Sequence, residues 1–421
     1  MSIIKTGLGS IVFGLYLLLI FSLGSMKPTI DVGFAEITPT DLIFPIVALC
    51  WLAAIIAGSC RFRWRFEFSI FAFYLATLTI SSVFSANPRL SFTRLLGVVY
   101  LTLLAAIGAS VVLTLDRVRI SILFWLAGSV LPLLAALIGI FLFYFFPGSP
   151  IIADLTYHYG AVPVGNFPRI SSTFVSASMF CNYLTATLVL AMLAIKMEWI
   201  TRRIAATIIL VVGVCALSTV SIALGGIALA VGLWIWVTNS KRPIGLASMI
   251  FGCVIAIAFL AIAPFALLNR GSATFFGRLE PSSRFLVWSD ALRTFFADPL
   301  TGNGLGTAVA NVTFHNYDGT WSLLTDAHNS FLNVAAQAGI LGLVGIVGIT
   351  VTTMRSTLST SANEDRNYIL LGLGIAFFTA FVYEGLTGSF EEARHLWVLM
   401  GLILAAKKIR EPHGSGALHS A

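Results

Sequence analysis

Charged side chains are scarce in this sequence. Only 10% of its 421 residues are Asp, Glu, Lys or Arg, whereas soluble globular domains carry about 25%. Hydrophobic residues make up 58% of the chain, and uncharged apolar runs of roughly 20 residues, the length that crosses a bilayer, recur from end to end. The composition excludes an ordinary soluble domain. It also excludes a membrane β-barrel, which would show short alternating segments in place of unbroken runs.

Clusters of metal-binding residues are lacking as well. The five cysteines are odd in number and scattered. None of them forms a CxxC pair or a Cys/His cluster, so we expect neither a disulfide framework nor a metal site. Such cysteines most often serve as small buried hydrophobic side chains. The sequence predicts no metal and no cofactor.

Twelve helical spans account for the apolar runs, and the predicted fold is an all-α polytopic membrane protein. The first run is longer than a signal-peptide core of ~7–15 residues, so we interpret it as an uncleaved span. The predicted spans are 7–26, 41–58, 68–84, 93–113, 120–146, 178–197, 203–218, 221–238, 244–267, 328–353, 367–387 and 392–406. They divide the chain into nine spans over 1–267 with a long loop at 147–177, a large loop at 268–327, three spans over 328–406 and a tail at 407–421.

The basic residues lie mostly on one side of these spans. Of the 25 Lys and Arg residues, 16 fall in one set of loops, which has a net charge of +10, while the other set has a net charge of −3. Cytoplasmic loops are enriched in Lys and Arg, so both termini and the 407–421 tail are predicted to be cytoplasmic and both long loops periplasmic. The overall charge of +7 is a topology signal and gives no reason to expect nucleic acid as a partner.

The large loop is predicted to contain an amphipathic helix over 282–297. Spacing at 100° per residue places Arg284 near the middle of its apolar sector, where an arginine needs a buried anionic partner. Arg293 lies on the opposite side and is expected in solvent. The following segment, Gly302-Asn303-Gly304-Leu305-Gly306, resembles a phosphate loop. No strand precedes it, however, and a turn that uses glycine's backbone freedom is favoured.

A polar cluster, Asp326-Ala327-His328-Asn329-Ser330, stands at the mouth of the tenth span. With a helix that begins two or three residues before His328, both His328 and Asn329 occupy its first turn, where unpaired N–H groups attract phosphate. The same field disfavours imidazolium, so we expect a neutral His328 that can accept a proton. A histidine that only caps the helix is the structural alternative. Gly339 and Gly342 farther along would let another helix approach closely.

Other charged residues are predicted near the same outer boundary. Arg169 precedes the sixth span, and Glu384 lies about 17 residues, or about 25 Å, from the cytoplasmic end of its span. Arg394 follows in the outer turn, where pairing with an acid is the structural alternative. Transporters place their ionisable residues near the bilayer midplane. The outer position instead favours chemistry on a lipid-linked substrate with an anionic head group, because arginine suits a diphosphate.

Three segments of the chain resemble the O-antigen ligase and exopolysaccharide polymerase superfamily. They are Asp326-Ala327-His328-Asn329-Ser330-Phe331-Leu332 with Gln337-Ala338-Gly339-Ile340-Leu341-Gly342, Ser283-Arg284-Phe285-Leu286-Val287-Trp288 with 298–306, and Arg169-Ile170-Ser171-Ser172-Thr173-Phe174. The chain departs from the family at Gln337, where glutamate is common, and at Ser221-Ile222-Ala223, where the family has a Ser-Arg pair.

The resemblance implies a GT-C-like, metal-independent glycosyltransferase of the bacterial inner membrane. Such an enzyme moves a glycan from undecaprenyl diphosphate to an acceptor at the periplasmic face. The predicted site comprises His328 and Arg284 as catalytic residues, Arg169, Arg284 and Asn329 as the diphosphate site, and Asp326, Glu384 and Arg394 as supporting residues.

The product of the transfer has two alternatives. Residues 388–397 resemble polymerase members of the family, so an exopolysaccharide polymerase is the first prediction, and a ligase that acts on lipid A core is the alternative. A lipid-linked oligosaccharide flippase is the non-enzyme alternative, and a transporter should tolerate the loss of His328. The expected partners are the lipid-linked donor, a glycan or lipid A core acceptor, the bilayer and other polysaccharide export proteins.

Overall fold

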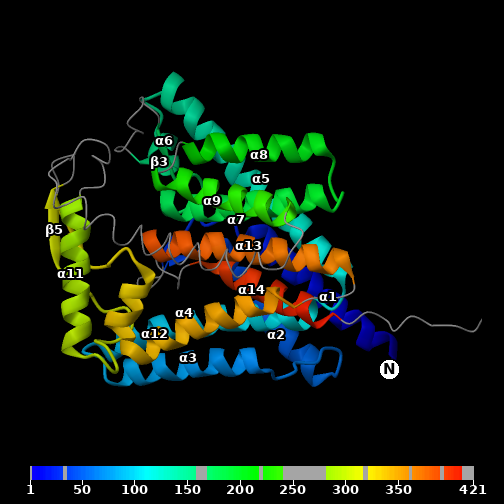
Figure 1. Ribbon diagram of the computed structural model, residues 1–421, viewed down its shortest axis with the longest axis horizontal. Coiled ribbons are helices and arrows are strands. Elements are labelled where there is room, and N and C mark those ends of the chain that lie inside the picture. The colour runs from blue at the N-terminus through cyan, green and yellow to red at the C-terminus, as the bar shows by residue number, and fades with distance from the viewer. Residues whose placement is uncertain are drawn as a thin grey trace, which may run out of the picture.

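The computed structural model of the chain is built of helices that run roughly along one long axis (Figure 1). It describes residues 2–31, 36–157, 168–217, 221–239, 281–315, 321–359, 363–388 and 393–409. The helices are α1 (Ser2–Ser22), α2 (Pro39–Ile56), α3 (Phe66–Val83), α4 (Pro88–Val111), α5 (Leu115–Phe145), α6 (Ile151–Leu155), α7 (Ala177–Lys196), α8 (Arg202–Leu217), α9 (Ser221–Asn239), α11 (Pro281–Ala297), α12 (Ser330–Thr357), α13 (Glu364–Thr387) and α14 (Arg394–Lys408).

Short antiparallel strand pairs complete the described structure. They are β1 (Ile30–Asp31) with β2 (Glu36–Ile37), β3 (Thr156–Tyr157) with β4 (Arg169–Ile170), and β5 (Val312–His315) with β6 (Trp321–Leu324). In the longest pair Val312 lies opposite Leu324.

The predicted all-α polytopic membrane architecture is confirmed. Seven of the described helices are long and apolar enough to cross a membrane, namely α2, α3, α4, α5, α7, α12 and α13. The outward face of α2 exposes Leu42, Ile46, Leu49 and Ile56, and a contiguous apolar face of this kind is suited to lipid. The predicted span at 244–267 lies outside the described residues.

Helix α14 lies inside the bundle and packs against α4, α12 and α13. Every residue from His395 to Ala406 is buried, as expected of a helix that is hydrophobic on all sides. Ion pairs hold both of its ends. Arg394 donates to both carboxylate oxygens of Asp41, at 2.9 and 2.8 Å, and Lys407 donates to Glu67 at 2.6 Å.

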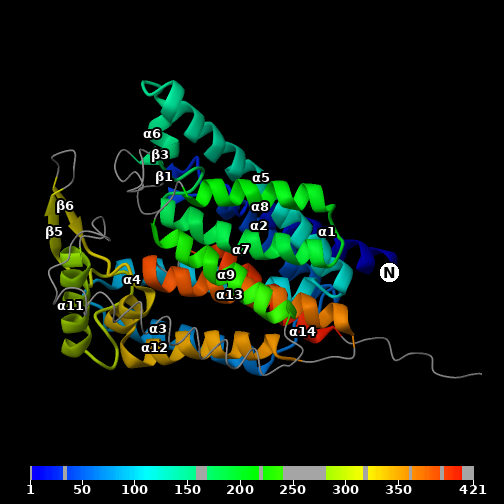
Figure 2. The same ribbon diagram turned by 45° about the horizontal axis from the view of Figure 1, so that its top comes forward.

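One end of the bundle carries a small separate layer, which we call the cap. It consists of α11, the segment 298–311, the β5–β6 pair and residues 325–329. Helix α11 crosses the long helices at this end, and the first residues of α1 lie at the opposite end (Figures 1 and 2). The cap has its own core, in which Val287, Trp288 and Ala291 of α11 pack with Val309, Ala310, Ala327 and Ala336. The amphipathic helix predicted over 282–297 is thus present, with Val287, Trp288 and Ala291 on its buried face.

Helix α12 is interrupted at Gly339, whose φ is +64° and ψ is −165°. A break in a helix leaves carbonyl and N–H groups without helical partners, and an apolar environment makes each of them costly. The prediction that Gly339 and Gly342 let another helix approach closely is wrong: the turn residue Leu300 lies against Gly339, and residues of α12 itself lie against Gly342. Another helix approaches α12 closely at Gly345, where an added β-carbon would lie 2.6 Å from the Tyr74 ring of α3.

The glycine segment 302–306 fills this break. The backbone N–H groups of Asn303 and Gly304 donate to the carbonyls of Ala336 and Gln337 at 2.9 and 3.0 Å, and Ile340 N donates to Pro299 O at 2.8 Å. Gly302, Gly304 and Gly306 all have positive φ, the conformation that glycine adopts at little cost. These bonds to protein carbonyls favour the turn interpretation of the segment over the phosphate loop.

Serines at the junction of α3 and α4 secure the segment from the other side. Ser81 Oγ donates to Gln337 O at 2.6 Å, and Ser91 Oγ donates to Leu305 O at 2.8 Å. Gly304 packs so closely against Ser85 that a β-carbon there would overlap the serine side chain. The cap is therefore joined to the membrane helices through main-chain hydrogen bonds.

We predict that Gly339→Ala destabilises the protein by at least ~2 kcal/mol, because alanine at positive φ costs about 1–2 kcal/mol and its β-carbon would overlap the carbonyl of Leu300. Thermal unfolding of the detergent-purified protein, followed by tryptophan fluorescence, measures this change. Gly97→Ala in α4 is the matched control, because nothing lies within 4 Å of the new methyl group. A Gly339→Ala protein that melts with the wild type would contradict the prediction.

Candidate functional site

His328 lies between the cap core and the start of α12, on a backbone with φ of +47°. This left-handed conformation is uncommon for residues other than glycine and costs energy that the surroundings must supply. The helix begins at Ser330, with Asn329 as its N-cap. The prediction that His328 and Asn329 occupy the first helical turn is therefore wrong: the Asn329 side chain accepts from Phe331 N and Leu332 N at 3.1 and 3.2 Å, and so starts the helix after itself.

The residue before the histidine is fixed on three sides. The Ala327 methyl group is fully buried in the cap core. Its carbonyl accepts from Trp288 Nε1 at 2.9 Å, and its N–H donates to Asn333 Oδ1 at 2.9 Å. Ala327 and the N-cap residue Asn329 flank His328 and are both held by hydrogen bonds. The backbone of His328 therefore has little freedom to move, and the imidazole is positioned by it.

Asp326 orients the histidine side chain. Its Oδ1 accepts from the backbone N–H of His328 at 2.5 Å and lies 3.5 Å from the imidazole Nδ1. Its Oδ2 accepts from Asn333 Nδ2 at 2.6 Å. The imidazole remains 43% exposed, so it is both anchored and accessible. The structure thus brings together three of the predicted residues, Asp326, His328 and Asn329.

Glu384 lies near the same helix start, on the neighbouring helix α13. Ser330 Oγ donates to the backbone carbonyls of Glu384 and Gly388, at 3.2 and 3.0 Å, which ties the first residue of α12 to the last turn of α13. The Glu384 carboxylate is buried and accepts a short hydrogen bond from Asn182 Nδ2 of α7. Glu384 therefore connects three helices directly behind the His328 segment.

The two arginines predicted to bind diphosphate lie at the cap end of the bundle. Arg284 is in the first turn of α11, but its side chain lies outside the described part of the structure. Arg169 begins β4 and pairs with Tyr157 of β3, which lies at the same end as α11 (Figures 1 and 2). The segment after Arg169 is firmly seated, because Ser172 Oγ donates to Pro132 O at 2.6 Å and Thr173 Oγ to Gly24 O at 2.5 Å.

Arg394 occupies a different environment. Its guanidinium binds Asp41 through two nitrogens and its side chain is only 17% exposed. The ion pair joins α14 to the start of α2, as the structural alternative for this residue supposed. The acids that follow α13 in the sequence, Glu391 and Glu392, lie outside the described residues.

Sequence reasoning missed the amides and hydroxyls that support the histidine. Asn333 lies four residues after Asn329, a spacing that places both on one side of a helix. Asn182 is a polar amide inside an apolar span, where such residues are rare and have a specific partner. Both signals were visible in the sequence. The Ser330 contacts depend on how α12 and α13 pack, which the sequence does not display.

Residues 204–347 match the family described as O-Antigen ligase. This region runs from α8 to the middle of α12 and contains Arg284, Asp326, His328 and Asn329, whereas Arg169, Glu384 and Arg394 fall outside it. No curated protein matches the chain.

We predict that Asn333→Ala lowers the rate of glycan transfer more than it lowers the folded fraction. The substitution removes the amide that holds both Ala327 N and the Asp326 carboxylate, and the buried Ala327 N–H left without a partner costs about 1–3 kcal/mol. Transfer assays at equal amounts of folded protein, together with melting curves, measure the two effects. Ser289→Ala on α11 is the control, since its hydroxyl bonds only within its own helix. Full activity in Asn333→Ala would remove this residue from the site.

Proposed function

We propose that this chain, whose residues 204–347 match the family described as O-Antigen ligase, moves a glycan from undecaprenyl diphosphate to an acceptor glycan at the periplasmic face of the bacterial inner membrane. The observation that carries the proposal is the environment of His328. An exposed imidazole stands on a left-handed backbone, is anchored on both sides, and has a carboxylate beside its Nδ1. Strained, preorganised residues of this kind cluster at active sites.

His328 is proposed as the general base. The Asp326 carboxylate beside Nδ1 favours the tautomer with its proton on that nitrogen, which leaves the lone pair of Nε2 to accept a proton. In an inverting transfer the acceptor hydroxyl oxygen attacks the anomeric carbon and gives its proton to this nitrogen. The bond between the anomeric carbon and the diphosphate oxygen breaks in the same step.

Arg284 and Arg169 are proposed to neutralise the leaving undecaprenyl diphosphate. Both lie at the cap end of the bundle, the end where α12 begins, and arginine binds phosphate oxygens through two parallel hydrogen bonds. Asn329 has its side-chain oxygen committed to the N-cap, so its part in the diphosphate site would fall to its amide nitrogen. Glu384 is proposed as a support behind the site. Arg394 would support it only indirectly, by fixing the end of α14.

We predict that His328→Ala and Arg284→Ala each lower transfer from a lipid-linked glycan by at least roughly 100-fold, the scale of general-base catalysis and of a lost donor to developing charge. The assay uses the purified full-length protein in the presence of EDTA. Wild-type rates in either variant would exclude that residue, and loss of wild-type activity in EDTA would exclude a reaction without metal.

The matched control for Arg284 is on the same helix. Arg293 lies two and a half turns farther along α11, its side chain is 82% exposed, and it pairs with Asp290 at 3.4 Å. Arg293→Ala removes the same charge from the same helix and should leave the rate within about twofold. Equal losses in both variants would indicate that the net charge of α11 matters, and not a contact made by Arg284.

The product of the transfer is proposed to be a growing exopolysaccharide, with ligation to lipid A core as the alternative. We predict that deletion of the gene abolishes secreted or capsular polymer and leaves lipopolysaccharide ladders intact, as judged by gel electrophoresis and sugar analysis of both fractions. The reverse pattern would identify a ligase. Complementation with the wild-type gene, but not with His328→Ala, ties the result to the proposed site.

A further inference from the structure

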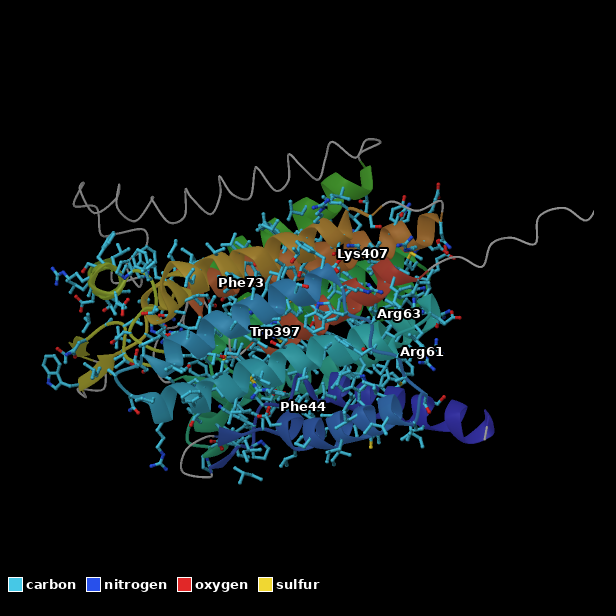
Figure 3. The ribbon with its side chains drawn as sticks, turned by 90° about the horizontal axis from the view of Figure 1, so that it is seen from below. Phe44, Arg61, Arg63, Phe73, Trp397 and Lys407 are labelled. Carbon is cyan, nitrogen blue, oxygen red and sulfur yellow. The ribbon has the colours of Figure 1, made fainter. Side chains whose placement is uncertain are left out.

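At the end of the bundle opposite the cap, we infer a binding site for the phosphate head group of an anionic phospholipid. Its residues are Arg61, Arg63 and Arg65, which lie between α2 and α3, and Lys408 at the end of α14. Figure 3 shows Arg61, Arg63 and Lys407 at this same end of the bundle. The inference does not depend on the glycan transfer proposed above.

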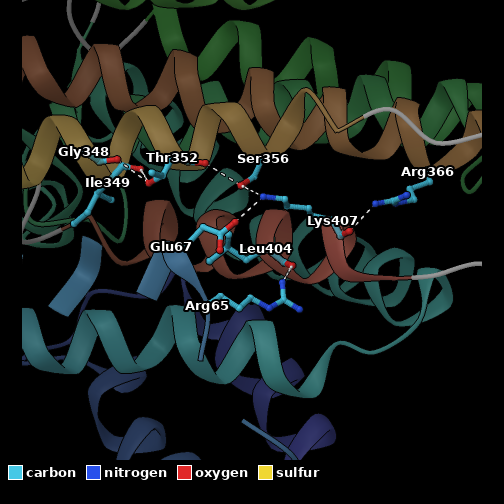
Figure 4. A network of polar contacts seen from close by, with 9 residues as sticks. All are labelled: Arg65, Glu67, Gly348, Ile349, Thr352, Ser356, Arg366, Leu404 and Lys407. Atoms are coloured by element: carbon cyan, nitrogen blue, oxygen red, sulfur yellow. Dashed lines mark hydrogen bonds and ion pairs between the residues drawn. The ribbon is translucent and has the colours of Figure 1, made fainter. Parts of the chain in front are cut away.

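The cluster gathers positive charge. Burial lowers the pKa of Lys408, and the nearby charges of Arg65 and Arg63 lower it further. Burial and the charge of Arg63 likewise lower the pKa of Arg65. The negative charge of Glu67 attracts Arg65, but the Glu67 carboxylate already accepts a hydrogen bond from Lys407 (Figure 4). Lys407 also donates to Ser356 at 3.3 Å. Like charges held this close repel one another, and a bound anion would relieve that repulsion.

The same end is tied together by further guanidinium groups. Arg65 Nη1 donates to Leu404 O at 3.4 Å, and Arg366 Nη2 donates to Lys407 O at 2.6 Å (Figure 4). Arg366 Nε also donates to Ala406 O at 3.1 Å. These bonds satisfy the last carbonyl groups of α14. The Arg65 bond also holds the loop between α2 and α3 against that helix, so the backbone that carries the arginines is fixed next to Lys408 before any ligand arrives.

Aromatic side chains alternate with the arginines. Phe62 packs against Trp51 and Phe68, with ring centroids 6.1 and 4.9 Å apart, and anchors the loop. Trp64 and Phe66 are instead 64% and 67% exposed. Exposed aromatics beside Arg and Lys are typical of the boundary between head groups and acyl chains.

The neighbouring aromatics decide the class of ligand. Arginine and lysine would accept the phosphate of a lipid or inorganic phosphate equally well, but only a lipid has acyl chains to cover Trp64 and Phe66. Basic pockets at the ends of membrane helices suit phospholipids with more than one negative charge. Cardiolipin carries two separate phosphate groups and can engage two members of the cluster at once, whereas phosphatidylglycerol offers only one phosphate.

The test measures binding to the purified full-length protein in neutral detergent, by native mass spectrometry and by the thermal shift on adding cardiolipin, phosphatidylglycerol, phosphatidylcholine or inorganic phosphate. We expect cardiolipin to bind most tightly, and phosphatidylcholine and inorganic phosphate to give no shift. In Arg61→Gln/Arg63→Gln we expect binding of cardiolipin to weaken by roughly tenfold or more, because two charged contacts are lost.

The control is Arg202→Gln/Arg203→Gln, which removes the same charge from two exposed arginines at the start of α8 and should bind cardiolipin like the wild type. Equal weakening in both double variants would overturn the site, because it would show attraction to total charge. An equal shift from inorganic phosphate would overturn the lipid assignment. Unchanged binding in Arg61→Gln/Arg63→Gln would overturn the inference as a whole.

Discussion

The need to satisfy main-chain hydrogen bonds at the break in α12 is the constraint on which the cap depends. A membrane helix normally satisfies all of its own backbone groups, and an interruption exposes several at once. At Gly339 they are bound by the segment 299–304, whose glycines supply both the positive φ angles and the close approach. From the junction of α3 and α4, Ser81 also donates to Gln337 O at the break, and Ser91 donates to Leu305 O of the glycine segment. The break is stable only because this segment fills it.

The position of His328 follows from the same arrangement. The segment in the break continues directly from α11, and Trp288 of α11 holds Ala327 in place. The first half of α12 carries Asn329 and Asn333, which cap the helix and fix the backbone before the histidine. The contact from α11 and the contacts from the start of α12 thus both hold the same two residues, Ala327 and His328. A change at Gly339 would therefore alter the position of the imidazole by displacing both the segment that follows α11 and the first half of α12.

The sequence predicted the elements well and their junctions less well. Apolar run length identifies a span because the thickness of the bilayer sets it, and the amphipathic helix at 282–297 followed from its 3.6-residue period. The break at Gly339 was missed because apolar residues continue on both sides of it, as they would in an unbroken helix. The helix start at Ser330 was missed because Asp326 and Asn329 are both good N-caps by type, and tertiary contacts decide which one acts.

Within the site, sequence proximity predicted some contacts and concealed others. Asp326, His328 and Asn329 are close in the chain, so their association required little beyond a turn. The Arg394–Asp41 pair joins residues 353 positions apart, so the sequence could predict that Arg394 pairs with an acid but not which acid. Arg394 holds the start of α14 in the bundle, and its ion pair with Asp41 explains how a charged side chain lies beside the buried residues of that helix. The ionisable residues at this boundary therefore divide into those that support the bundle and those that surround an accessible histidine. His328 differs from Arg394 in being both fixed and exposed, and that combination makes it the residue on which the proposed chemistry rests.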